Sequence, residues 1–184
     1  MSEGKLIYFI GPRASGKTRV SQALAAKLQI PSIDLDDYFS EKFKMSIQKF
    51  VKENDWSAFR REESLILREV TAKYYPEMAI LATGGGIVLD ENNSIFMRDH
   101  GQVFYLKVDV ATLVSRLQKD PKSAQRPSLT NLTLQDEVSQ VLASREPLYL
   151  AAATQIVDGS KNLEFVLENI VKTLFFEDQI MLKS

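Results

Sequence analysis

The sequence predicts a three-layer α/β fold, in which a central five-stranded parallel sheet is covered by helices on both faces. Short apolar runs alternate with longer segments of helical periodicity, which favours strand–helix–strand units with right-handed crossovers. The strongest runs are apolar at every position, as in strands that are buried on both faces of a parallel sheet. The length of 184 residues suits one domain, so we expect residues 1–184 to form a single unit.

The expected strands and helices alternate along the chain. Residues 6–10 read LIYFI, and residues 78–82 and 103–106 are similarly apolar, whereas residues 32–35 and 155–157 are weaker strand candidates. In the segments between these runs, apolar residues recur three and four positions apart. This periodicity predicts helices over residues 17–28, from 56 to about 70, and over 111–119, 133–144 and 163–174.

The composition excludes several kinds of chemistry. The chain has no cysteine and one histidine, so disulfides, thiolate catalysis and cysteine-based zinc sites are ruled out. His100 lies in the polar stretch 99–101, which is typical of a surface turn. Lys plus Arg (23) nearly balances Asp plus Glu (24), so there is no overall basic field to hold nucleic acid. Any catalysis relies on carboxylates, lysine, arginine, backbone amides or a hard metal ion.

No segment has the length expected of a membrane or secretion signal. The apolar run at residues 6–10 is too short for the core of a signal peptide. No run approaches the roughly 20 apolar residues that span a bilayer. We therefore expect a cytoplasmic protein with neither a membrane nor a nucleic-acid partner.

The most specific motif follows the first expected strand. Residues 11–18 read GPRASGKT and fit the phosphate-loop (P-loop) pattern G-x-x-x-x-G-K-[ST] in full. In this pattern backbone N–H groups and a helix N-terminus surround a phosphate, the lysine adds a full charge, and the hydroxyl can ligate Mg²⁺. The chain is thus predicted to bind a nucleoside triphosphate. The candidate contacts are Gly11, Ala14, Ser15, Gly16, Lys17 and Thr18.

A short acidic motif follows the second expected strand. Alternation within the strand predicts that Asp34 and Asp36 point to the same side, at the edge of the sheet where α/β proteins bind ligands. One carboxylate could hold Mg²⁺ through water, and the other could take the proton of a substrate hydroxyl. The alternative is an acidic cluster at a helix N-terminus, formed by Asp36 and Asp37.

Two further segments resemble parts of a substrate site. Arg60 and Glu63 are three residues apart on an expected helix, and Glu63 falls on an otherwise apolar stripe, so it could fix Arg60 for a carboxylate or phosphate. Gly84, Gly85 and Gly86 follow a buried strand and would let the backbone approach a ligand closely.

Together these segments resemble the shikimate kinases, small P-loop enzymes that phosphorylate shikimate at its 3-hydroxyl. The resemblance covers nearly the whole chain, because the order of motifs continues through Arg126-Pro127 and the sequence REPLY at residues 145–149. It implies a P-loop fold like that of nucleoside monophosphate kinases. It also implies that ATP and shikimate are the substrates, that Mg²⁺ is the cofactor, and that the protein is a monomer.

The resemblance also assigns roles to individual residues. Thr18 and Asp34 would hold Mg²⁺, and Asp36 would bind the substrate hydroxyls and act as the base. The substrate site, with a binding region at about 34–63, would comprise Asp36, Arg60, Gly84, Gly85, Gly86 and Arg145. Arg126 would belong to a lid at about 120–130 that closes onto the phosphates, which makes Lys17, Asp36 and Arg126 the predicted catalytic residues.

Two alternatives remain open at the level of sequence. A kinase of the same fold could act on gluconate or a nucleoside monophosphate, because paired arginines suit many anionic acceptors. A nucleotide-binding protein without turnover is the alternative from another functional class.

Overall fold

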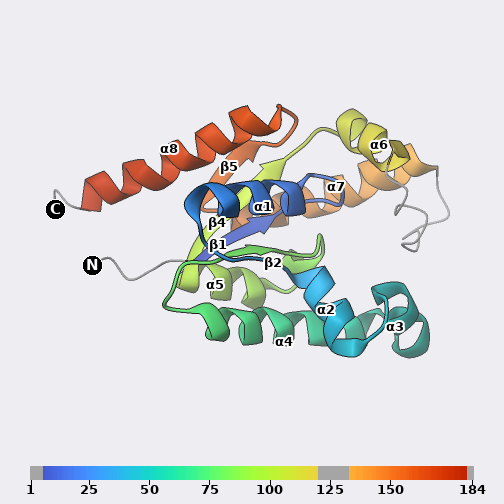
Figure 1. The fold of residues 1–184 in the computed structure, drawn as a ribbon. Helices are drawn as coiled ribbons and strands as arrows, with labels where there is room; N and C mark the ends of the chain where they lie inside the picture. The colour runs from blue at the N-terminus through green and yellow to red at the C-terminus, as the bar shows by residue number, and fades with distance from the viewer. Residues whose placement is uncertain (1–5, 120–132, 182–184) are drawn as a thin grey trace.

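The sheet has the predicted architecture. The structure, a computed structural model, describes residues 6–119 and 133–181, and its five strands are parallel in the order β2-β3-β1-β4-β5. Helices cover both faces of this sheet, which confirms the three-layer prediction (Figure 1). The strands are β1 (Leu6–Ile10), β2 (Ser32–Asp34), β3 (Ile80–Ala82), β4 (Gly101–Lys107) and β5 (Gln155–Asp158).

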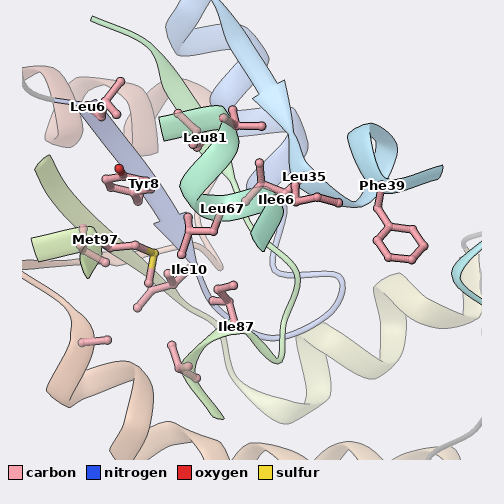
Figure 2. Close-up of a cluster of buried hydrophobic side chains, with 14 of the residues drawn as sticks. Leu6, Tyr8, Ile10, Leu35, Phe39, Ile66, Leu67, Leu81, Ile87 and Met97 are labelled. Carbon is pink, nitrogen blue, oxygen red and sulfur yellow. The ribbon is translucent and has the colours of Figure 1, made fainter. Parts of the chain in front are cut away.

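The two faces of β1 pack against different helices. Leu6, Tyr8 and Ile10 face a cluster that includes side chains of α4 and α5, as Figure 2 shows. Ile7 and Phe9 face α1 and α8 on the other side. The helical elements are α1 (Lys17–Leu28), α2 (Leu35–Phe43), α3 (Ile47–Asn54), α4 (Trp56–Tyr74), the short 3₁₀ helix η1 (Ile87–Leu89), α5 (Glu91–His100), α6 (Val110–Lys119), α7 (Leu134–Ala152) and α8 (Leu163–Met181).

The strand order brings three loops to one edge of the sheet. β3 lies between β2 and β1, with Asp34 opposite Ala82 and Phe9 also opposite Ala82. The chain segments that leave the carboxyl ends of β1, β2 and β3 therefore start side by side. These segments carry the P-loop, the acidic motif and the three glycines.

Four phenylalanines fix the position of α2 and α3 next to this edge. The ring of Phe39 lies 4.6 Å from that of Phe43, 5.0 Å from Phe50 and 5.1 Å from Phe59 between centroids. Their contacts join α2, α3 and the start of α4, so the first turns of α4 are held beside the P-loop side of the sheet.

Several sequence predictions about helices were wrong. The helix expected at 133–144 continues to Ala152 through Pro147, because the packing of Tyr149 in the core offsets the hydrogen bond that proline cannot make. His100 does not lie in a turn: it is the last residue of α5, and its Nδ1 is 2.8 Å from the Phe96 carbonyl oxygen. α3 and α5 were not expected at all, and α2 was expected only in the alternative that placed Asp36 and Asp37 at a helix N-terminus. No helix within the described residues is long and apolar enough to span a membrane.

Candidate active site

The P-loop has a backbone conformation that requires glycine at both ends. Gly11 has φ +144°, and a Cβ there would lie 2.9 Å from the Leu106 carbonyl oxygen. Gly16, at the start of α1, has φ +99°. Lys17 is only 9% exposed, and its ammonium donates hydrogen bonds of 2.9 Å to the carbonyl oxygens of Gly11 and Pro12. This loop thus holds a buried cation at the N-terminus of a helix, a favourable arrangement for a phosphate.

Thr18 and Asp34 meet beside the loop. The Thr18 hydroxyl donates to Asp34 Oδ2 at 2.6 Å, while Asp34 Oδ1 accepts from the backbone N–H groups of Asp36 and Asp37 at 2.9 and 3.3 Å. The reasoning from strand alternation was wrong here, because β2 ends at Asp34 and Asp36 lies in the first turn of α2. Asp34 is the N-cap of that helix, and the cap directs its second oxygen to Thr18.

The Thr18–Asp34 pair suits Mg²⁺. Both side chains offer hard oxygen ligands, and Mg²⁺ commonly takes one or two protein oxygens and completes its shell with phosphates and water. Over residues 6–119 and 133–181, no group of three or more His, Cys, Asp or Glu side chains could hold a metal by itself. A metal held by Thr18 and Asp34 would take its other ligands from phosphate oxygens and water.

A pocket of about 160 Å³ lies next to the P-loop, and we call it the inner pocket. Its wall includes Pro12 and Arg13 of the P-loop. The same wall also includes every residue that was predicted to bind the substrate, namely Asp36, Arg60, Gly84, Gly85, Gly86 and Arg145. Residues that are more than a hundred positions apart in sequence thus line one space beside the predicted phosphate site.

Arg60 is held by a buried carboxylate. Arg60 Nη1 lies 2.5 Å from Glu63 Oε2, and the exposed fractions of the two side chains are 27% and 5%. Burial raises the pKa of the Glu63 carboxyl, the Arg60 charge opposes this shift, and nearby Asp36 adds to it. Glu63 Oε1 has no hydrogen-bond partner among the described residues. This geometry fits the role of Glu63 that the sequence suggested, as the residue that orients Arg60.

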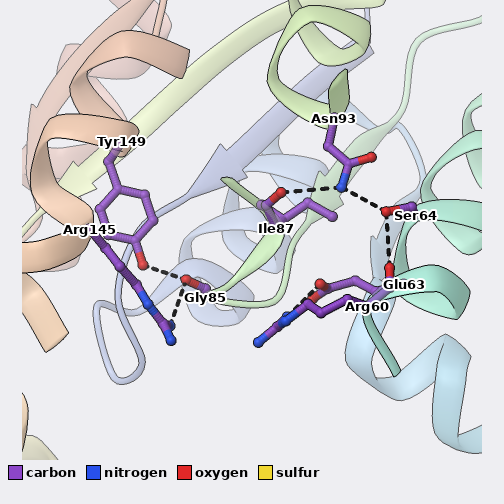
Figure 3. Close-up of polar contacts among 8 residues, drawn as sticks. All are labelled: Arg60, Glu63, Ser64, Gly85, Ile87, Asn93, Arg145 and Tyr149. Atoms are coloured by element: carbon purple, nitrogen blue, oxygen red, sulfur yellow. Dashed lines mark hydrogen bonds and ion pairs between the residues drawn. The ribbon is translucent and has the colours of Figure 1, made fainter. Parts of the chain in front are cut away.

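Arg145 reaches the pocket from the opposite side. Its Nη1 donates to the Gly85 carbonyl oxygen at 3.2 Å, and the Tyr149 hydroxyl donates to the same oxygen at 2.5 Å. Figure 3 shows the guanidinium groups of Arg60 and Arg145 on either side of this backbone, extending toward the same space. Burial raises the pKa of Tyr149 to about 12, so its hydroxyl stays protonated and remains a donor.

A side chain at Gly84 or Gly86 would overlap the charged side chains of the pocket, whereas one at Gly85 would make an ordinary contact with the P-loop. A Cβ at Gly84 would lie 2.5 Å from Glu63 Oε1 and 2.9 Å from Asp36 Oδ1, so both carboxylates face the same backbone atom. A Cβ at Gly85 would lie 3.4 Å from the backbone nitrogen of Arg13, and one at Gly86 would lie 2.2 Å from Arg60 Nη2. The glycine segment therefore packs between the P-loop and the charged side chains of the pocket.

The sequence matches the family model described as "Shikimate kinase" over residues 13–175. The chain belongs to the shikimate kinase family. A Yersinia pestis (strain Pestoides F) protein named shikimate kinase 2 is 41% identical over 91% of this chain and 94% of its own length. A shikimate kinase 2 from Enterobacter sp. (strain 638) is 44% identical with the same coverage.

Solved shikimate kinases have the same fold. The structure of the Acinetobacter baumannii shikimate kinase in complex with shikimate has a TM-score of 0.85 at 27% identity, covering 95% of this chain and 94% of that one. The Bacteroides thetaiotaomicron shikimate kinase has a TM-score of 0.84 at 29% identity, covering 92% and 98%. Arg126 and the lid predicted at about 120–130 lie outside the described residues.

Other residues of this shikimate kinase family member support the site but were not found from sequence. Arg116 of α6 donates to the carbonyl oxygens of Ala14 and Ser15 at 3.3 and 3.1 Å, and to that of Gly159 at 2.8 Å. It thereby ties the outer side of the P-loop to the loop that follows β5. Its P-loop partners are about a hundred residues away in sequence, so no local sequence pattern predicts this contact.

A buried polar network holds α4 against the glycine segment. Asn93 is 1% exposed, and its side-chain amide donates to Ser64 Oγ at 2.9 Å and to the Ile87 carbonyl oxygen at 3.2 Å. Ser64 in turn donates to the Arg60 carbonyl oxygen at 3.0 Å (Figure 3). The backbone that carries Arg60 is thus linked to the 3₁₀ turn that follows Gly86.

Proposed function

We propose that the chain transfers the γ-phosphoryl group of ATP to the 3-hydroxyl of shikimate, giving shikimate 3-phosphate and ADP in the pathway to chorismate and aromatic amino acids. One observation carries this proposal most directly: Arg60 and Arg145 converge with Asp36 in a pocket that borders the P-loop. Two guanidinium groups suit the carboxylate of shikimate, and a carboxylate together with backbone groups suits its hydroxyls. The family membership supports the same substrate.

In the proposed reaction the oxygen of the 3-hydroxyl attacks the γ-phosphorus, and the bond from that phosphorus to the β–γ bridging oxygen breaks. The hydroxyl proton passes to Asp36, and ADP leaves with the bridging oxygen. Phosphoryl transfer depends mainly on alignment and charge neutralisation, so no histidine or cysteine is needed. Lys17, which lies in the described part of the chain, is placed to stabilise negative charge on the phosphates. Arg126 is predicted from the sequence to do the same.

Mg²⁺ is part of the proposal as cofactor, with Thr18 and Asp34 as the residues that would hold it. When bound with ATP, the ion would neutralise charge on the β- and γ-phosphates. Thr18 and Asp34 already contact each other at 2.6 Å, so their oxygens are fixed in place before a nucleotide arrives. A monomeric state and a cytoplasmic location remain predictions from the sequence.

A panel of acceptors tests the proposed function. ADP release by the purified protein should be fast with ATP, Mg²⁺ and shikimate, and slow with ATP and Mg²⁺ alone. Gluconate and nucleoside monophosphates should not replace shikimate. Turnover of either acceptor in place of shikimate would overturn the proposal, as would ATP binding with no product from any acceptor.

Gly86→Ala should displace Arg60 without unfolding the protein. Gly86 has φ −109°, which alanine can adopt, and the three atoms nearest the added methyl all belong to the guanidinium of the flexible Arg60 side chain. We expect the KM for shikimate to rise by roughly tenfold to a hundredfold, because a displaced Arg60 would lose its charged hydrogen bond to the substrate carboxylate. Steady-state kinetics and thermal melts measure the two effects.

A double-mutant cycle is the control for Gly86→Ala. In an Arg60→Ala background the same substitution should raise the KM no further, because the side chain that it displaces is gone. Additive effects of the two substitutions would contradict this explanation, and so would a large loss of thermal stability in the single variant.

The KM for shikimate should depend on the protonation of Glu63. Its pKa is raised above the ordinary value of 4.5, so as pH falls Glu63 gains a proton at a higher pH than an exposed glutamate. Arg60 then loses its charged partner, and the KM should rise as pH is lowered from about 8 to 5. In Glu63→Gln the KM should be high and nearly independent of pH over this range. Equal profiles in both proteins, at saturating ATP, would contradict the prediction.

A further inference from the structure

A second, open hollow of about 820 Å³ lies on the outer side of the arginine pair, and we call it the outer hollow. It is bordered by the start of α4, by η1 and by the middle of α7. Trp56, Arg60, Val141 and Arg145 line both this hollow and the inner pocket. The two spaces therefore meet at the side chains that are predicted to bind the substrate carboxylate.

The charge of the outer hollow is entirely positive over the described residues. Arg60, Arg61 and Arg145 line it, and no aspartate or glutamate does. The inner pocket, by contrast, has Asp36 and Glu63 in its wall as well as arginines. An anion outside the arginine pair thus faces guanidinium groups without a compensating carboxylate in the same wall.

Arg61 differs from the other two arginines. It lines the outer hollow but not the inner pocket, and its side chain is exposed. It makes no hydrogen bond or ion pair with any residue in the ranges 6–119 and 133–181. Its charge thus has no partner among the described residues, and Arg61 is absent from the wall of the inner pocket, where the bound carboxylate is expected.

The walls beside Arg61 combine positive charge with apolar surface. Trp56 and Leu89 are 39% and 49% exposed, and they provide apolar surface next to the guanidinium groups. Clefts of one charge with apolar walls concentrate the electric field and raise the local concentration of an oppositely charged ligand. Such a field acts mainly on the rate of association.

We propose that the outer hollow is the route by which the anionic substrate enters, and that Arg61 captures its carboxylate there before passing it to Arg60 and Arg145. This inference rests on the proposed function, because it takes shikimate as the anion. Arg61 is then a residue of the encounter complex: it accelerates binding and contributes nothing to the chemical step.

Association kinetics at several ionic strengths test this proposal. Trp56 is the single tryptophan of the chain, and the Arg60 guanidinium lies 5.4 Å from its ring, so its fluorescence can report shikimate binding in a stopped-flow instrument. At about 10 mM salt, Arg61→Gln should lower the association rate constant about fivefold, the effect in water of one unit charge about 4 Å from the carboxylate that it captures. Arg61→Glu should lower it further, and Arg61→Lys should restore it.

The effect should disappear at about 1 M salt, where charges are screened within roughly 3 Å. The dissociation rate constant and kcat should stay at wild-type values, and kcat/KM should show the same salt dependence as association. Phosphorylation of the uncharged methyl ester of shikimate should be unaffected by Arg61→Gln. Lys172→Gln is the matched control, since it removes one exposed positive charge from α8, on the other face of the sheet from α4 (Figure 1).

Three results would overturn the proposal: equal association rates for wild type and Arg61→Gln at low salt, a loss that appears in kcat or dissociation, or an equal loss in Lys172→Gln. The proposed function fails separately. If the wild-type protein neither binds nor phosphorylates shikimate, the function is wrong; if it does both while Arg61→Gln behaves identically, only the entry route is wrong.

Discussion

Asp36→Asn should lower kcat by roughly 10² to 10⁴, because positioned proton transfer contributes rate factors of this size. The substitution keeps the shape of the side chain but removes the carboxylate that would accept the proton of the 3-hydroxyl. Asp36 faces Gly84 at the end of β3 and lines the inner pocket beside the P-loop. Steady-state kinetics with shikimate and ATP measure the effect, and the KM for ATP should change little.

Asp37→Asn is the matched control for this experiment. Asp37 is the next residue along α2, but it does not line the inner pocket. The same loss of one negative charge should therefore leave kcat near the wild-type value. If kcat of Asp36→Asn stays within about threefold of wild type, a catalytic base contributing the usual factor is not present at this position.

Arg145→Ala should raise the KM for shikimate by roughly 10- to 150-fold, since a hydrogen bond to a charged group contributes about 1.5–3 kcal/mol. The effect of this variant on KM is easier to separate from an effect on stability than that of Arg60→Ala. Arg145 donates a hydrogen bond to the backbone carbonyl of Gly85, whereas Arg60 forms an ion pair with buried Glu63. Removing Arg60 leaves the buried Glu63 carboxylate without its ion pair. In that variant the KM for shikimate should rise and the thermal stability should fall.

Arg98→Ala controls for the loss of one arginine. Arg98 is exposed on α5, and its guanidinium donates to the Ala151 carbonyl oxygen outside the inner pocket. Its removal should leave the KM for shikimate unchanged. A wild-type KM in Arg145→Ala would show that this arginine does not bind the substrate carboxylate.

The parts of the fold that could be predicted have strong local signals. The strand Leu6–Ile10 is apolar at every position, and the P-loop pattern that follows it marks the start of α1, so both elements were placed with their observed bounds. The grouping of the glycines with Arg60 and Arg145 was predictable from the family resemblance, and the structure brings these residues to one pocket. Their roles in binding remain predictions.

The helical segments that the sequence did not predict are stabilised by tertiary contacts. α5 has a polar sequence, but the buried side chains of Asn93 and Met97 hold it against its neighbours. α7 passes through Pro147 because Tyr149 packs in the core, with its ring stacked 5.1 Å from that of Tyr105. The sequence predicted the end of this helix at residue 144 because the contact that stabilises its continuation comes from β4, which is distant in sequence.

The geometry of the acidic motif was misjudged for a different reason. β2 has three residues, too few for the alternation argument to extend to Asp36. The capping bonds of Asp34, not the pleat of a strand, set the directions of the two carboxylates. The alternative reading, an acidic helix N-terminus, described the local structure correctly, and it is compatible with a predicted role in holding Mg²⁺.

The preference for shikimate over its methyl ester tests the central claim most directly, because the ester keeps the ring and hydroxyls and removes only the negative charge. If Arg60 and Arg145 bind the carboxylate, wild-type kcat/KM should favour shikimate by about 10²-fold or more, and most of this preference should vanish in Arg145→Ala. An unchanged preference in Arg145→Ala, or none in the wild type, would contradict the account.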